Sequence, residues 1–86
     1  MHTVDVLDQA LDLAGQLGYL IRYEWLGGSG GGGCELNEQK VLFLDLALGP
    51  DDQLDRVLDT LRLSPEIVTL PMSDQLRHLL GVRKIA

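Results

Sequence analysis

The stretch Lys40-Val41-Leu42-Phe43-Leu44-Asp45-Leu46 is an almost continuous apolar run, and it decides which fold the chain can form. Large apolar side chains of this kind favour a β-strand, and Gly49-Pro50 ends the run shortly afterwards. Alternation along a strand places Leu42, Leu44 and Leu46 on one face and Val41 and Phe43 on the other. Because both faces are apolar, we expect both faces of this strand to be buried.

Two more strands are predicted upstream of this run. Residues Tyr19–Leu26 alternate between apolar and charged side chains over much of their length, which is typical of a strand with one solvent-exposed face. Residues Cys34–Leu36 form a short strand, and Asn37-Glu38-Gln39 provides the turn into the apolar run. The glycine segment, residues 27–33, then serves as a flexible loop between the first two strands. Together the three strands predict an antiparallel meander.

Helices are predicted on both sides of this meander. Apolar residues recur at helical spacing from Val4 to Leu17, with Thr3 placed to cap the helix and Gly18 placed to end it. Downstream of the strands the sequence predicts a helix from Asp51 to Leu63, a short edge strand at 67–70, and a last helix that Ser73 caps and Gly81 ends. The expected fold class is α+β: a single two-layer domain of residues 1–86, with both main helices on one face of the sheet.

A two-layer domain leaves one face of the apolar strand without a cover. Two candidates can supply it: the C-terminal segment of the same chain, or a second copy that meets the first through a symmetric interface. We expect a homodimer, with Leu42, Leu44 and Leu46 as its interface residues.

Composition and charge narrow the function classes. The 86 residues include 45% hydrophobic and 23% charged residues, as in a folded domain, and the formal net charge is −6. Acidic residues dominate positions 1–60, while the small basic excess after residue 60 is too weak for a nucleic-acid interface. The single cysteine, the lack of a signal-like N-terminus and the lack of a long apolar run predict a cytoplasmic protein that does not bind membranes.

The glycine segment matches several nucleotide and hydrolase motifs by composition alone. A dinucleotide loop needs a helix directly after the glycines, whereas a strand follows here. A triphosphate loop needs Lys and then Ser or Thr after its last glycine, where this chain has Cys34 and Glu35. A G-x-S-x-G elbow with Asp45 and His78 needs a much larger sheet. Three interpretations stay open: a plain flexible loop, an engineered linker, and a nest of backbone amides that binds a small anion. The residues of that nest are Gly28, Ser29, Gly30, Gly31, Gly32, Gly33 and Cys34.

Three side chains could carry chemistry outside the glycine segment. Cys34 with His78 could form a nucleophile and base, although a small apolar role for Cys34 is the simpler interpretation. Asp45 interrupts an apolar strand, so it must be paired, exposed or functional, and we expect it to accept hydrogen bonds from backbone N–H groups or an arginine. The spacing of Cys34, His2 and His78 gives no metal motif, and no cofactor is predicted.

The second predicted helix carries a line of aspartates on its polar side. Asp52 with Arg56 and Asp59 with Arg62 have the spacing of ordinary surface ion pairs. The function predicted from all these features is a small, acidic, non-enzymatic module that self-associates and binds a protein partner. Its partner contacts would use the apolar strand face or the basic end around Arg77, Arg83 and Lys84. The alternatives are an anion binder at the glycine segment and an enzyme that uses Cys34, or Asp45 with His78.

Overall fold

The computed structural model describes residues 3–82, and within that range it has the α+β composition that the sequence predicts. Arg83 and Lys84 of the predicted basic end, and His2, lie outside the described residues. The elements in chain order are α1 (Thr3–Gln16), β1 (Leu20–Glu24), β2 (Gly32–Leu36), β3 (Gln39–Asp45), α2 (Pro50–Arg62), the 3-10 helix η1 (Pro65–Thr69) and α3 (Asp74–Leu80).

The three strands form a mixed sheet in the order β1-β3-β2, so the predicted antiparallel meander is wrong. β1 pairs with β3 in parallel, with Ile21 opposite Leu42, and β2 pairs with β3 in antiparallel fashion, with Cys34 opposite Val41. β3 is the most apolar strand, so it gains most from the central position, where neighbours cover both of its edges. The glycine segment therefore crosses the end of β3 instead of closing a hairpin between β1 and β2.

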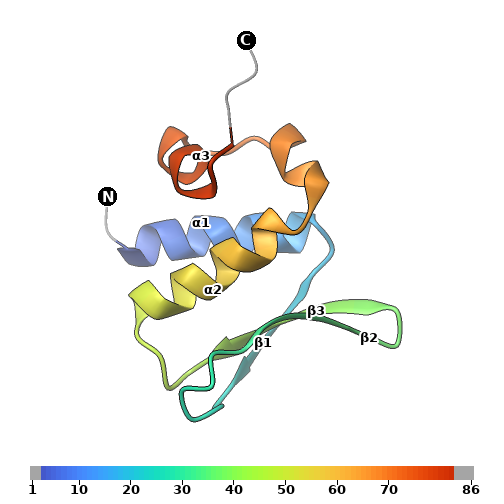
Figure 1. Cartoon of the computed structure of the whole chain (residues 1–86), viewed down its shortest axis with the longest axis vertical. Coiled ribbons are helices and arrows are strands. Elements are labelled where there is room, and N and C mark those ends of the chain that lie inside the picture. The colour runs from blue at the N-terminus through green and yellow to red at the C-terminus, as the bar shows by residue number, and fades with distance from the viewer. Residues whose placement is uncertain (1–2, 83–86) are drawn as a thin grey trace.

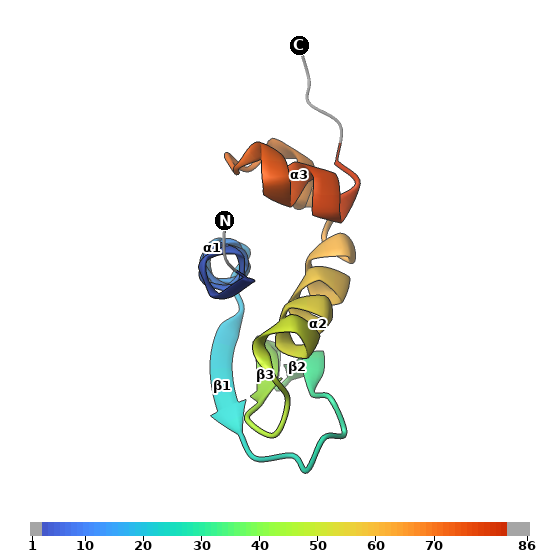
Figure 2. The ribbon, with the colours of Figure 1, turned by 90° about the vertical axis from the view of Figure 1, so that its left-hand side faces the viewer.

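Helices α1 and α2 cover one face of this sheet, as predicted. Figure 1 shows the two helices side by side, and Figure 2 shows them on the same side of the strands. β3 contributes Leu42 and Leu44 to the core, and both are almost fully buried. The helices contribute the remaining large part of the core: Val6, Leu7, Ala10, Leu13 and Ala14 from α1, and Leu54, Val57, Leu58 and Leu61 from α2.

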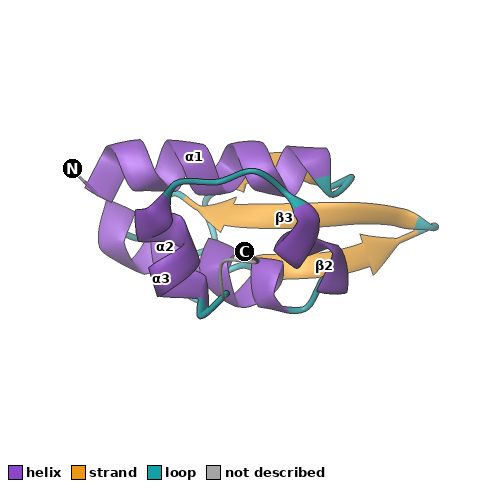
Figure 3. Cartoon of the chain, turned by 90° about the horizontal axis from the view of Figure 1, so that it is seen from above, coloured by secondary structure: helices purple, strands orange, loops and turns teal. Residues whose placement is uncertain are grey.

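The C-terminal segment lies on the helices and not on the sheet. The predicted strand at 67–70 instead forms the end of η1, with Leu70 as the C-cap, because Pro65 starts a turn in which the Ile67 N–H donates to the Ser64 carbonyl and Ile67 is buried. α3 forms as predicted, with Ser73 accepting the Leu76 N–H and Gly81 in the left-handed conformation at its end. Seen from above, α1 runs alongside the strands, and the β2–β3 hairpin extends beyond the helices (Figure 3).

This placement overturns one of the two predicted covers for the sheet. η1 and α3 contact α2 on the side that faces away from the strands, so three tiers follow one another: α3 with η1, then α1 with α2, then the sheet (Figures 1 and 2). No element among residues 3–82 covers the second face of the sheet. We call this second face the open face.

Candidate functional site

Asp45 is the anchor of the glycine segment. Its carboxylate is 1% exposed and accepts four backbone hydrogen bonds at the end of β3. The N–H groups of Gly28 and Gly30 donate to Oδ2 at 2.9 and 3.1 Å. Those of Leu26 and Ala47 donate to Oδ1 at 3.1 and 2.9 Å. The expected pairing of Asp45 with backbone N–H groups is confirmed, and the carboxylate fills part of the nest that the glycines form.

These contacts set the charge state of Asp45. Burial raises the pKa of the carboxyl, but the hydrogen bonds from Ala47, Gly30, Leu26 and Gly28 favour the ionised form and together lower the pKa below its ordinary value. Asp45 is therefore an ionised structural acceptor at neutral pH. A general acid would need the opposite shift.

The glycine segment needs glycine for conformational and steric reasons. Gly27, Gly28, Gly30, Gly31 and Gly32 all have positive φ, between +66° and +123°, which L-residues with a side chain rarely adopt. A Cβ at Gly31 would overlap the carbonyl oxygen of Phe43. The composition of the segment thus follows from one defined path over the end of β3.

Helix α2 approaches the glycine segment with two side chains that the sequence analysis did not link to it. Thr60 is buried and accepts the Gly33 N–H on Oγ1 at 3.2 Å. The Arg56 guanidinium lies against Gly30, within 2.8–2.9 Å of the position that a Cβ would take there. Arg56 and Thr60 are one helical turn apart on α2, and that spacing is the only signal in the sequence that could have grouped them.

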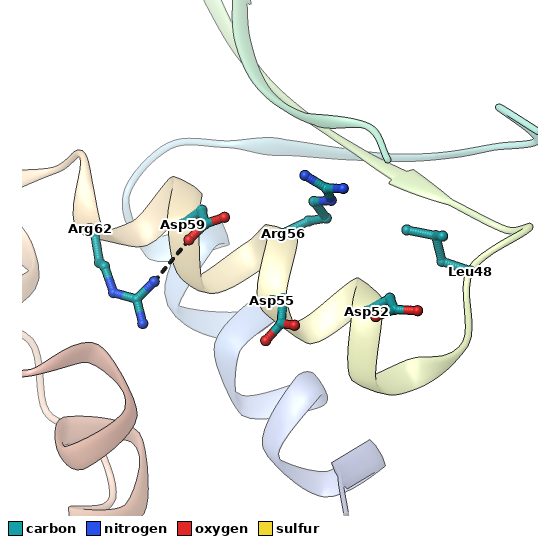
Figure 4. Close-up of a pocket in the computed structure, with 6 residues that line it drawn as sticks. All are labelled: Leu48, Asp52, Asp55, Arg56, Asp59 and Arg62. Carbon is teal, nitrogen blue, oxygen red and sulfur yellow. Dashed lines mark hydrogen bonds and ion pairs between the residues drawn. The ribbon is translucent and has the colours of Figure 1, made fainter. Parts of the chain in front are cut away.

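The Arg56 side chain points away from the acidic side of its own helix. The predicted ion pair between Asp59 and Arg62 forms at 2.9 Å, but the ion pairs of the described residues do not include Asp52 with Arg56. Figure 4 shows Arg56 pointing toward the strands and away from Asp55, across a hollow that Leu48, Asp52, Asp55, Arg56, Asp59 and Arg62 line. The predicted anion site therefore has the Arg56 cation beside it, and three aspartates line the same hollow.

The nucleophile and base pair that the sequence allowed is not assembled. Cys34 is exposed on β2, whereas His78 is exposed on α3. The layer formed by α1 and α2 lies between the sheet and α3 (Figure 2). The same layer separates Asp45 from His78.

The open face of the sheet carries a cluster of apolar side chains. Register and alternation place Leu20, Val41 and Cys34 in one row across it, and Phe43 lies in the next row between Arg22 and Gly32. Leu36 continues the face at the other end of β2. Leu20 is 54% exposed and Leu36 is 48% exposed, while Val41 is buried between its neighbours.

Residues predicted for the dimer interface lie elsewhere. Leu42 and Leu44 belong to the core beneath the helices, so they cannot contact a second chain; only Leu46 is exposed. The leucine face of β3, predicted to form the interface, is thus buried inside the chain, and the opposite face is the one that remains uncovered. Helices α1 and α2 pack on the face of β3 that carries Leu42 and Leu44, and the face of Val41 and Phe43 is left open.

Charge on the open face is balanced. Arg22 and Glu24 form an ion pair at 2.9 Å, and the Arg22 guanidinium lies 5.8 Å from the centre of the Phe43 ring. Asp45 is buried beneath the glycine segment. The open face is thus nearly neutral on a chain of net charge −6, and much of the negative charge lies on the exposed sides of the helices.

Residues 3–82 contain neither a metal-binding cluster nor a helix that could span a membrane. No group of three or more His, Cys, Asp and Glu side chains there is placed to hold a metal ion. None of the helices in that range has the length and apolarity that crossing a membrane requires. Comparisons of the chain with protein families, with curated proteins and with solved structures gave no match.

Proposed function

We propose that this chain is a non-enzymatic interaction module that associates with a second copy of itself through the open face of its sheet. The observation that carries the proposal is the uncovered apolar face, since η1 and α3 lie on the far side of α2. Exposed Leu20 and Leu36 lose contact with water when this face is covered, which favours association.

Charge favours a second copy over a charged partner. Two chains of net charge −6 repel each other least when they meet through their most neutral surface, and the open face carries only the internally paired Arg22 and Glu24 near its rim. A strongly basic partner would be drawn to the aspartates of the helices instead. The open face therefore suits a partner that is as apolar and as neutral as itself.

The size of the face sets the expected affinity. Strands of five to seven residues rise about 3.3 Å per residue and lie about 4.8 Å apart, so the footprint is only a few hundred Å² against about 800 Å² per partner in a standard interface. The dimer is therefore expected to be weak and concentration-dependent, with a dissociation constant on the order of 10 to 1,000 μM.

Sedimentation velocity over a dilution series tests the proposal. The wild-type chain should shift from monomer to dimer as its concentration rises, and Leu20→Ser should weaken that shift. Leu63→Ser is the matched control, because Leu63 is 76% exposed but lies at the C-terminal end of α2. A monomer at every concentration, or equal weakening by both variants, would refute the proposal.

One observation favours a second function, the binding of a small anion at the glycine segment. The Arg56 guanidinium lies beside Gly30 and takes part in neither of the two ion pairs within residues 3–82, so it can meet a ligand there. One contact opposes anion binding, because the N–H groups of Gly28 and Gly30 already donate to Asp45.

Titration with inorganic phosphate tests this second function. It should shift the amide NMR signals of residues 27–33, and Arg56→Gln should abolish the shifts while Arg62→Gln preserves them. Unchanged amides would exclude this function.

A further inference from the structure

The open face carries a knob and a hollow that could fit each other in two copies of the chain. The hollow lies beside Phe43 and is lined by Leu26, Ser29, Gly31, Gly32, Gly33, Cys34 and Phe43. Three of these lining residues are glycines, so part of its wall is backbone without side chains. The knob is Leu36, which is 48% exposed at the far end of β2.

The register of the sheet places these two features symmetrically. Along the open face, Leu36 and Gln39 form one row, Leu20, Val41 and Cys34 form the next, and the row of Arg22, Phe43 and Gly32 follows, with Arg22 on the edge strand β1. Rows on one face are about 6.6 Å apart, since side chains return to the same face every second residue. The middle row is therefore equidistant from the knob and from the hollow.

We infer that two copies pair open face to open face about a two-fold axis lying along the row Leu20–Val41–Cys34, so that Leu36 of each copy enters the hollow beside Phe43 of the other. This inference rests on the proposed self-association and specifies its geometry. Such an interface is isologous, because each copy supplies one knob and one hollow. The apolar middle row then faces its own symmetry mate at the centre.

The alternative axis, parallel to the strands, is disfavoured by the same register. It would lay β1 of one copy over β2 of the other and bring Arg22 and Glu24 against the apolar hollow. Burying a charged pair against apolar and backbone groups carries a desolvation cost. With the axis along the middle row, Arg22 and Glu24 stay at the rim, where water can solvate them.

Cys34 gives a direct test, because it is the only cysteine of the chain and lies on the proposed axis. Paired sheets lie about 10 Å apart, too far for a disulfide between directly opposed residues but within reach of a short bifunctional thiol reagent. The wild-type chain should give a covalent dimer whose yield rises with concentration. The double variant Cys34→Ser, Glu66→Cys moves the thiol to exposed η1 and should give only the slow background of random collisions.

A second pair of variants tests the knob. Leu36→Ala should weaken the dimer about tenfold or more, because the two-fold symmetry removes the anchor from both hollows at once. Leu46→Ala is the control, since Leu46 is also 48% exposed but lies outside the three rows. A dimer seen by sedimentation that neither cross-links through Cys34 nor responds to Leu36→Ala would overturn this geometry and leave self-association standing. Absence of any dimer would overturn both.

Discussion

Asp45 shows how one polar residue can order a segment that its own sequence would leave mobile. Burial costs an ionised carboxylate its hydration by water. This desolvation cost is offset when several N–H groups donate hydrogen bonds to the carboxylate, as four do to Asp45. In the folded chain those N–H groups include two from the glycine segment, so the carboxylate and the segment depend on each other.

Replacing Asp45 should therefore cost stability in a pH-dependent way. Its pKa is lower in the folded chain than its ordinary value of 3.8, so the ionised carboxylate contributes stability that is fully present above that value. This contribution is lost as the pH falls through the folded-state pKa. We expect Asp45→Asn to lower the urea midpoint strongly at pH 7, and the gap to wild type to narrow as the pH drops below about 4.

Urea unfolding of Asp45→Asn and of the wild type, at pH 7 and at a pH below about 4, checks this expectation. Asp8→Asn is the control, since Asp8 is exposed on α1. A gap between Asp45→Asn and wild type that stays constant down to the lowest pH would show that the charge of Asp45 is not what holds the segment.

Two glycines of the segment separate backbone cost from steric cost. Gly27 and Gly31 have the same φ of +66°, but a Cβ at Gly27 meets nothing within 4 Å, whereas one at Gly31 meets the Phe43 carbonyl. Gly27→Ala should cost about 1–2 kcal/mol of unfolding free energy for the left-handed conformation alone. Gly31→Ala should cost at least about 2 kcal/mol more, because the backbone must move. Equal losses in thermal or chemical unfolding would mean that the segment does not follow the path described.

At the scale of the elements, the β2–β3 hairpin contains a residue that does not suit its turn. Asn37 and Glu38 have φ of 51° and 67°, the pattern of the tight turn that prefers Asn-Gly. Glu38→Gly should raise the unfolding free energy by about 1 kcal/mol, since glutamate is strained in this conformation. Asn37→Gly should gain less, because asparagine tolerates positive φ. Thermal unfolding of the two variants measures both gains in unfolding free energy. A gain for Asn37→Gly that equals or exceeds the gain for Glu38→Gly would contradict this assignment of the turn.

Most of the helices and strands could be predicted from the sequence, but their arrangement could not. The helix that Ser73 caps and Gly81 ends, and the strand around Phe43, follow from local patterns that tertiary contacts do not override. Strand order is different, because pairing depends on contacts between distant residues. The near-continuous apolar sequence of β3 is typical of a central strand, and the structure places β3 at the centre of the sheet. The predicted meander wrongly places it at an edge.

The candidate site was predictable only in part. Asp45 was identified because a carboxylate in an apolar strand demands a partner. Arg56 and Thr60 were missed because the helix that carries them folds back over β2 from far along the chain. The choice between the two faces of β3 was also out of reach, because each face is apolar and only the packing of α1 and α2 decides which one is buried.

At the scale of the whole molecule, net charge opposes the association that the open face favours. Two copies of charge −6 repel through the solvent, and salt screens this repulsion over a Debye length of about 10 Å at 0.1 M. The dimer should therefore tighten as the salt concentration rises from low to moderate values, since its contacts are apolar. Sedimentation at several salt concentrations measures this effect. Weakening with salt would indicate that ion pairs, and not apolar contacts, hold the copies together.

Methyl chemical shifts across a dilution series would map the self-association surface of the unmodified chain. If the open face is the self-association surface, the methyl signals of Leu20, Leu36 and Val41 should move with concentration. Those of Leu63 and Val68, which are exposed on the other side of the molecule, should stay fixed. Signals that are all independent of concentration, or that move at Leu63 and Val68 instead, would contradict the account.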